Sequence, residues 1–200
     1  MLTETLLLVR AGGTAWDAAG RVCGLADPSL DARGVSEAES LADGLARYAP
    51  TLVVTSPLRR AVRTGGVIAQ ESNATLVIDP RFIDRDFGQW TGAMRVEVER
   101  KRRSIGRSPG VESVAGVMER ARQALDELVV ANPGVVLVIV THDAVIRPLL
   151  ADLVPKQATG MALRTGSWSR LVRDDGNWRA EALDREASYG RRPRQALGHG

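Results

Sequence analysis

The chain has 200 residues, which fits one domain with enough residues to bury a sizeable core. Hydrophobic residues make up 44% of it and charged residues 26%, as in ordinary globular proteins. The formal net charge is only +3, and no apolar run reaches the roughly 18 residues that a membrane span needs. These values argue against a membrane protein and give no support to nucleic-acid binding.

The start of the chain and its cysteine count bear on the compartment. Residues 1–4 lack the basic start and the long apolar run of a signal peptide, so we expect a cytoplasmic protein. Cys23 is the only cysteine and cannot form an internal disulfide, which agrees with a reducing compartment.

Strand-like and helix-like segments alternate along the chain, which indicates an α/β fold with a largely parallel sheet. The last two strands are joined by an Asp-Asp-Gly turn and form a predicted hairpin. Pro57 is expected in the first turn of its helix. The predicted strands are residues 5–10, 52–55, 75–79, 134–141, 168–173 and 177–183, and the predicted helices are residues 34–48, 57–70, 93–103, 113–130 and 144–153.

Polar sequences follow directly after three of the predicted strands. Arg10 ends the first strand, Arg59 and Arg60 come shortly after the second, and His142 follows the strand over residues 134–141. In open parallel sheets, ligands bind beyond the carboxyl ends of the strands. Two guanidinium groups and an imidazole at one edge of the sheet would form a pocket for an anion.

These segments resemble the motifs of the histidine phosphatase superfamily, which is phosphoglycerate-mutase-like. The first family motif is an apolar strand that ends in Arg-His-Gly-Glu-Thr, followed by a Trp. Here the matching residues are Arg10-Ala11-Gly12-Gly13-Thr14, followed by Trp16. The other segments that match, in the family's order, are residues 23–34, 56–64, 83–92, 109–113 and 138–147.

The resemblance implies a three-layer α/β/α sandwich with a mostly parallel central sheet and a short cap insertion. We expect the domain to span residues 1–184, with the cap at about residues 92–113. Residues 185–200 are rich in arginine and polar residues, and we expect them to form a disordered basic tail.

The chemistry of this family uses each residue type for a physical reason. A histidine nitrogen attacks phosphorus and forms a phosphohistidine, which splits one difficult step into two. Arginines and a second histidine surround the phosphoryl oxygens, where negative charge is spread in the transition state. A carboxylic acid protonates the leaving oxygen and then activates water. The resemblance implies no metal and no other cofactor, and the sequence shows no cluster of metal ligands.

Carried onto this chain, the resemblance assigns a role to each matching residue. Arg10 and Arg60 clamp the phosphate, and His142 donates to it. Asp84 takes the acid/base position, ahead of the nearby Asp86. The other positions that the resemblance implies are the nucleophile position at Ala11 and the substrate-binding positions at Thr14, Asp17, Cys23 and Gly24.

Several of these positions depart from the family pattern. Ala11 is the decisive one, because a methyl group has no lone pair and no phosphoenzyme can form there. Gly13 replaces the usual Glu, and Asp143 stands where Gly is more common. Asp17 replaces an amide with a carboxylate, which weakens anion binding unless it is protonated or turned away.

The sequence leaves four functions open. The chain is a pseudophosphatase that binds a phosphorylated or other anionic small molecule, or a phosphomonoesterase or mutase captured as an engineered His→Ala variant. Alternatively, it is an acid/base enzyme that uses Asp84 and His142 on an anionic substrate, or a structural subunit. The change at Gly13 beside Ala11 favours natural divergence over engineering. We expect no nucleic-acid or membrane partner, whereas a homodimer is compatible with the family.

Overall fold

The computed structural model describes residues 4–158 and 161–187. Six strands form one sheet in the order β3-β2-β4-β1-β5-β6. The first four strands in this order run parallel, and the hairpin of the last two is added to β1 in antiparallel orientation. The predicted, mostly parallel sheet is thereby confirmed. The strands are β1 (Glu4–Arg10), β2 (Leu52–Thr55), β3 (Thr75–Ile78), β4 (Val136–Thr141), β5 (Ser167–Asp174) and β6 (Asn177–Glu186).

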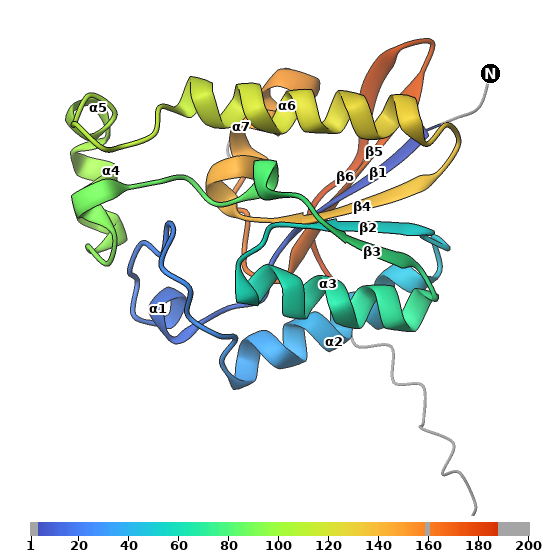
Figure 1. The fold of residues 1–200 in the computed structure, drawn as a ribbon, viewed down its shortest axis with the longest axis horizontal. Coiled ribbons are helices and arrows are strands. Elements are labelled where there is room, and N and C mark those ends of the chain that lie inside the picture. The colour runs from blue at the N-terminus through green and yellow to red at the C-terminus, as the bar shows by residue number, and fades with distance from the viewer. Residues whose placement is uncertain (1–3, 159–160, 188–200) are drawn as a thin grey trace, which may run out of the picture.

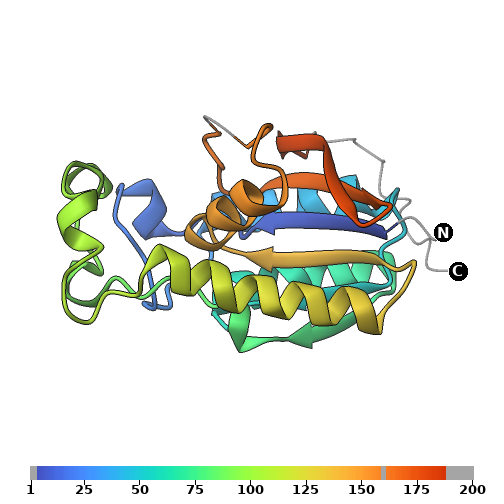
Figure 2. The same cartoon turned by 90° about the horizontal axis from the view of Figure 1, so that it is seen from above.

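Helices cover both faces of the sheet and complete the expected three layers (Figures 1 and 2). Helices α2 (Ala32–Ala46) and α3 (Arg59–Ser72) pack on one face. Helices α6 (Val114–Ala131) and α7 (Asp143–Leu153) pack on the other. The fold class predicted from the sequence is therefore confirmed.

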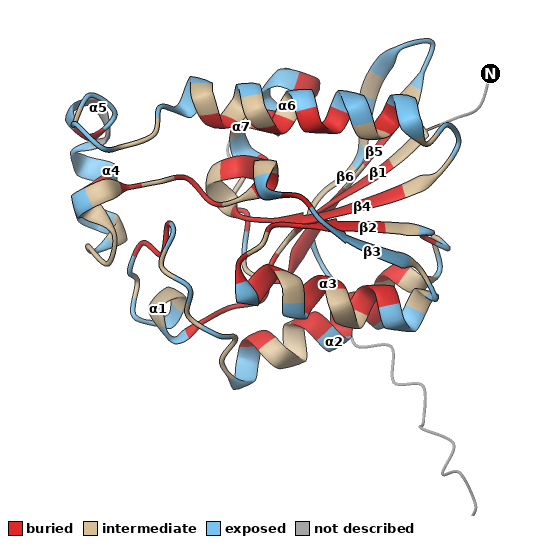
Figure 3. Cartoon of the chain, viewed as in Figure 1, coloured by how far each residue is buried: buried red, intermediate tan, exposed pale blue. Residues whose placement is uncertain are grey.

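The continuous apolar run of β1 follows from its place between the two helical layers. Side chains alternate between the faces of a strand, so a strand buried on both faces needs apolar residues throughout. Leu6 and Leu8 pack with residues of α6 and α7, whereas Leu7 and Val9 pack with residues of α2 and α3. Figure 3 shows the same burial along β1, β2 and β4, whereas β3 is exposed at the edge of the sheet.

The chain beyond the carboxyl ends of the parallel strands is built from short elements with a small apolar cluster of their own (Figure 2). The single helix predicted over residues 93–103 is wrong, because the helix is interrupted at Lys101. The segment between residues 79 and 93, for which we predicted no helix or strand, also contains two short 3₁₀ helices. The elements of this region are α1 (Ala15–Ala18), η1 (Pro80–Phe82), η2 (Gly88–Trp90), α4 (Arg95–Arg100) and α5 (Arg102–Ile105), and its apolar cluster is Val22, Phe87, Val98 and Ile105.

Helix α3 begins later than predicted. Its first residue is Arg59 and its N-cap is Leu58, so Pro57 lies before the helix rather than in its first turn. Leu58 offers no side-chain oxygen to the free N–H groups of the first turn. The second residue of the helix is Arg60, and this placement directs its guanidinium toward the end of the sheet.

The end of the domain also differs in detail from the expectation. Strand β6 continues to Glu186, so residues 185 and 186 belong to the sheet rather than to a tail. Ala187 packs against the apolar cluster of α2 and α3, and the rest of the predicted basic tail, residues 188–200, lies outside the described residues. Within the described ranges, no helix combines the length and the apolarity that crossing a bilayer would require.

Candidate functional site

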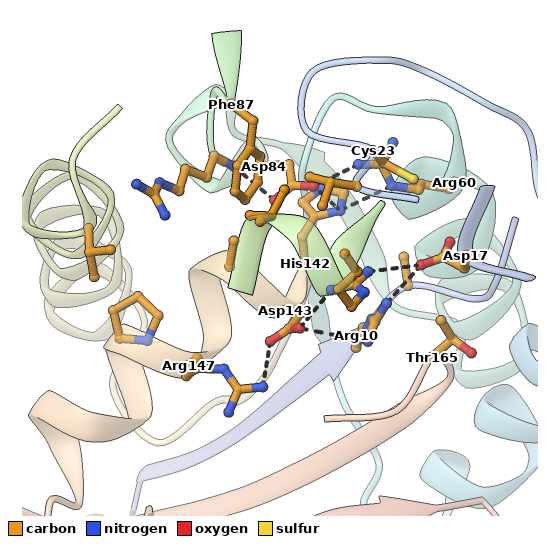
Figure 4. A pocket seen from close by; sticks show the side chains of 18 of the residues that line it. Arg10, Asp17, Cys23, Arg60, Asp84, Phe87, His142, Asp143, Arg147 and Thr165 are labelled. Atoms are coloured by element: carbon orange, nitrogen blue, oxygen red, sulfur yellow. Dashed lines mark hydrogen bonds and ion pairs between the residues drawn. The ribbon is translucent and has the colours of Figure 1, made fainter. Parts of the chain in front are cut away.

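A cavity of about 560 Å³ lies where the polar segments after β1 and β4 meet the start of α3 (Figure 4). The sequence predicted that several polar groups meet at the carboxyl ends of the parallel strands, and the structure brings these groups together. The predicted site residues that line the cavity are Arg10, Ala11, Asp17, Cys23, Arg60, Asp84 and His142. The structure adds further charged residues to the lining, namely Arg85, Arg95, Glu99, Asp143 and Arg147.

Arg60 is the buried centre of one half of the site. Its Nε donates to Nδ1 of His142 at 3.2 Å, and its Nη2 donates to Oδ2 of Asp84 at 3.0 Å. The same guanidinium donates to the backbone carbonyls of Gly24 and Ala26 at 3.1 and 2.9 Å. A buried charge needs such partners, because water is not available to solvate it. Arg60 is therefore held by three chain segments at once.

His142 is held in one tautomer by its two neighbours. A guanidinium can only donate, so Nδ1 of His142 accepts from Arg60 and carries no proton. The other ring nitrogen, Nε2, then donates to Oγ of Ser56 at 2.8 Å. Burial, reinforced by the charges of Arg60 and Arg10, lowers the pKa of His142 well below its usual value. His142 is therefore neutral, and its one N–H is directed at Ser56 rather than at an anion in the cavity.

Asp84 is a carboxyl group whose protonation changes near neutral pH. Its Oδ1 accepts from the backbone N–H of Arg85 at 2.8 Å, and its Oδ2 accepts from Arg60. Burial raises the pKa of Asp84 to about 6, although the charge of Arg60 opposes this shift. Oδ2 lies 3.9 Å from Nδ1 of His142. Such a group can give up or take up a proton in the cavity.

The loop that carries Asp84 is fixed from helix α6. Arg120 donates to the carbonyls of Arg81 and Asp84 at 2.6 and 3.3 Å, and its Nε forms a 2.7 Å ion pair with Glu112. The competing carboxylate, Asp86, accepts from the backbone N–H of Gly88 at 2.7 Å and does not line the cavity. The geometry therefore places Asp84, and not Asp86, in the site.

Arg10 belongs to a second, more open cluster of charges. Its Nη2 lies 2.8 Å from Asp17, and its Nη1 lies 4.0 Å from Asp143. Arg95 lies 3.8 Å from Asp17 and 3.5 Å from Asp143, and Arg147 lies 2.9 Å from Asp143. Figure 4 shows Arg10 between the two carboxylates. The three arginines on this side therefore share two carboxylates of the chain itself, which compensate part of their charge.

Ala11 lies between Arg10 and the tight turn after β1. Its N–H donates to the carbonyl of Thr141 at 2.9 Å, which continues the pairing of β1 with β4. The next residue, Gly12, has no room for a side chain, since an added Cβ would lie 2.4 Å from the carbonyl oxygen of Gly34. The turn therefore holds the Ala11 backbone in place, with its methyl group buried in the cavity wall.

Comparison with known proteins decides the family. A sequence profile described as the histidine phosphatase superfamily (branch 1) matches residues 6–185. The chain belongs to the histidine phosphatase superfamily. Phosphoserine phosphatase 1 of Hydrogenobacter thermophilus is 32% identical over 159 residues, which cover 74% of this chain and 75% of that protein. Probable phosphoglycerate mutase GpmB of Serratia proteamaculans is 29% identical over 186 residues, which cover 86% of each protein.

Solved structures agree with this assignment to the histidine phosphatases. A mycobacterial glucosyl-3-phosphoglycerate phosphatase in complex with VO3 is 25% identical and has a TM-score of 0.80. The match covers 90% of this chain and 98% of that structure. A structure described as mycobacterial hydrolase 1 has a TM-score of 0.83 at 25% identity and covers 92% of this chain. The relatives compared here are thus named as phosphatases, mutases or hydrolases.

Two of the residues expected in this histidine phosphatase site lie behind the cavity. Thr14 is fully buried and caps α1, where its hydroxyl donates to Asp17 at 2.8 Å. Gly24 adopts a φ of 51° and offers only its carbonyl to Arg60. Neither residue lines the cavity of about 560 Å³, although Thr14 lines an adjoining cavity of about 320 Å³ that shares Arg10 and Asp17 with it.

The cysteine expected in the site does line the cavity. Burial, and next the negative charge of Asp17, raise the pKa of the Cys23 thiol. The thiol therefore stays protonated at neutral pH, and a protonated thiol is a poor nucleophile.

Sequence reasoning did not identify Arg85, Arg95 and Arg147 as site residues, and it noted Asp143 only as a departure from the family. Asp143 and Arg147 are four residues apart at the start of the helix predicted over residues 144–153, and this spacing was a usable signal for their ion pair. Arg95 and Arg85 come from the segment between β3 and α6, whose path was not predictable from local pattern.

Proposed function

We propose that this chain binds a phosphorylated or other anionic small molecule without forming a phosphoenzyme. Membership of the histidine phosphatase superfamily and the convergence of Arg10, Arg60 and Asp84 on one cavity support an anion site. The proposal depends on Ala11, which lines the cavity and which we align, from the sequence motif, with the nucleophilic histidine of the family. The methyl group of Ala11 cannot attack phosphorus, so the covalent route of the family is closed.

Three side chains of the cavity, those of Cys23, His142 and Asp84, are poorly suited to replace the missing nucleophile. Cys23 is the one thiol among the described residues that line it, and its raised pKa keeps it protonated. The two nitrogens of His142 are engaged by Arg60 and Ser56. Asp84 is bound through both of its carboxyl oxygens. These contacts support binding without turnover.

One observation favours a second candidate, an acid/base enzyme that acts on an anionic substrate. Asp84 has its pKa raised to about 6 and lies 3.9 Å from a neutral His142. General acid–base chemistry requires positioned proton carriers and does not require a nucleophile at position 11. In this alternative, Asp84 exchanges the proton with a substrate that Arg10 and Arg60 hold.

Restoring the nucleophile tests the proposal. We expect the Ala11→His variant to gain turnover of p-nitrophenyl phosphate, whereas the wild-type chain shows none above background. The gain would show that the rest of the phosphatase site is intact. If the variant binds vanadate but shows no turnover, other parts of the catalytic machinery have also diverged and the acid/base candidate is favoured. Turnover by the wild-type chain itself would contradict the proposal.

Binding experiments test the anion pocket separately from turnover. We expect calorimetry to detect weak binding of inorganic phosphate or vanadate to the wild-type chain and to find it abolished in Arg60→Met. The neighbouring Arg59 is exposed and offers a matched control, since Arg59→Met removes an arginine outside the cavity. Identical heats for the wild type and both variants would contradict a phosphate role.

A further inference from the structure

The cavity has two chemically different walls. At the end of the sheet it is lined by the arginines and carboxylates described above. The remaining lining is a set of aliphatic and aromatic side chains, here called the apolar wall, from the segment after α1, the segment around η2 and α4, and the helices α6 and α7. The apolar lining residues are Val22, Phe87, Val98, Val114, Ala144, Pro148 and Ala151.

The apolar wall reaches from the buried end of the cavity to solvent. Phe87 and Val98 are buried and belong to the small apolar cluster with Val22 and Ile105. Val114, at the start of α6, is 51% exposed although it is a large apolar residue, and Ala151 on α7 is exposed as well. Val114 and Ala151 line the cavity and are exposed to solvent. When an apolar group of a ligand covers them, apolar surface is removed from water and binding is favoured.

The charged wall is almost neutralised by groups of the chain itself. Five arginines and four carboxylates line the cavity. Asp17 and Asp143 pair with Arg10, Arg95 and Arg147, and Asp84 pairs with Arg60. A ligand with a second anionic group would approach these carboxylates and be repelled by them.

Arg85 is the cavity arginine whose charge is least compensated. Its Nε donates to the carbonyl of Glu112 at 2.7 Å, and no carboxylate within 4.0 Å pairs with it among the described residues. Its guanidinium carbon lies 5.0 Å from the centre of the Phe87 ring. A cavity arginine without a close ion-pair partner therefore lies beside Phe87 of the apolar wall.

Resting on the proposed function, we propose that the preferred ligand carries one phosphoryl group on an uncharged apolar body, such as an aryl or branched alkyl group. The phosphoryl group lies among the arginines, and the body lies against the wall that Phe87, Val98 and Val114 form. Phosphorylated ligands with an additional carboxylate bind less well, because Asp17 and Asp143 already occupy the arginines that a second anion would need.

Three phosphonates, which resist hydrolysis, separate the parts of this proposal. Methylphosphonate supplies the head alone, phenylphosphonate adds an apolar body, and 2-carboxyethylphosphonate adds a second anion. By calorimetry on the wild-type chain, we expect phenylphosphonate to bind roughly tenfold or more tightly than methylphosphonate, because burying a ring removes apolar area from water. We expect 2-carboxyethylphosphonate to bind no more tightly than methylphosphonate.

Two exposed wall residues allow the apolar contact to be removed without disturbing the fold. We expect Val114→Asn and Ala151→Asn each to weaken phenylphosphonate about threefold or more, with methylphosphonate unchanged. Val130 lies on the same helix as Val114, is 80% exposed and does not line the cavity, so Val130→Asn is the matched control. The control is expected to bind all three phosphonates as the wild type does.

The outcomes distinguish this inference from the proposed function. If no phosphonate binds, the anion pocket itself is wrong and both proposals fall. If methylphosphonate binds and phenylphosphonate binds no more tightly, the anion pocket stands and the ligand class is wrong. Tighter binding of 2-carboxyethylphosphonate than of phenylphosphonate also overturns the ligand class. An equal loss of phenylphosphonate binding in Val114→Asn and Val130→Asn removes the apolar wall from the explanation.

Discussion

The two arginines that the sequence placed in the anion pocket lie in very different surroundings. Arg60 is 3% exposed and donates to Asp84, His142 and two backbone carbonyls. Arg10 is partly exposed, and its charge is shared with Asp17 and Asp143 in a cluster that solvent reaches. Arg60 is thus fixed by buried partners on one side of the cavity, whereas Arg10 lies in a more open network of ion pairs on the other. Substitutions on the two sides should therefore differ in kind.

The largest effect is expected on the buried side. Arg60→Met removes the cation that pairs with buried Asp84 and leaves two carbonyls without their donor. Breaking a buried pair in this way costs about 3–5 kcal/mol of the free energy of unfolding. Urea denaturation measures this loss, and the exposed Arg59→Met should change the free energy by less than about 0.5 kcal/mol. If the two variants are equally stable, Arg60 has no structural role and does not differ in this respect from an exposed arginine.

The pH dependence of stability tests the surroundings of Asp84. Its pKa is raised to about 6, so between pH 4 and pH 6 the folded chain holds a proton that the unfolded chain releases. The contribution of Asp84 is therefore greatest at low pH and is lost as pH rises through 6. Relative to the Asp84→Asn variant, the wild type should lose about 2–3 kcal/mol of stability between pH 4 and pH 7.

The comparison with Asp84→Asn is needed because His142 acts in the opposite direction. Its lowered pKa means that the unfolded chain takes up a proton below the usual histidine pKa, whereas the folded chain does not. The stability that comes from the neutral imidazole is therefore present at high pH and lost on acidification. Both proteins contain His142, so the difference between them isolates Asp84. If the wild type instead gains stability relative to Asp84→Asn as the pH rises from 4 to 7, the raised pKa of Asp84 is contradicted.

On the open side, a substitution should change binding more than stability. Asp143→Asn removes a carboxylate from Arg10, Arg95 and Arg147, so these arginines become available to a ligand. We expect inorganic phosphate to bind about threefold to tenfold more tightly, whereas stability changes by about 1 kcal/mol or less. Asp152→Asn on the same helix is the control, because Asp152 is exposed and lies outside the cavity. Weaker phosphate binding in Asp143→Asn would show that this carboxylate does not compete with anions.

Much of the fold was predictable because its signals are local. Each of three elements, β1, α2 and β4, has buried residues whose spacing can be recognised within the element's own short sequence. The ends of elements were less predictable. Nothing in the sequence around Lys101 marks the interruption of the helix there, and Pro57 suits a helix start that the structure places two residues later.

The site was predictable only where the chain itself signals it. Arg10 and His142 follow strong strands, so their meeting at one edge of the sheet follows from topology. The contacts that these residues make were not predictable, because Asp17, Asp143 and Arg95 come from three separate segments. The direction of the His142 proton toward Ser56 depends on the Arg60 side chain, which local pattern cannot place.

The most direct test of the central claim is to look for a phosphoryl adduct. The wild-type chain and the Ala11→His variant are incubated with p-nitrophenyl phosphate, quenched in denaturant at high pH, and measured by intact-protein mass spectrometry. Ala11→His serves as the positive control, because it restores a nitrogen at the position that we propose for the nucleophile. We predict no adduct on the wild-type chain, although it binds phosphate under the same conditions. A phosphoryl adduct on the wild-type chain would contradict the account.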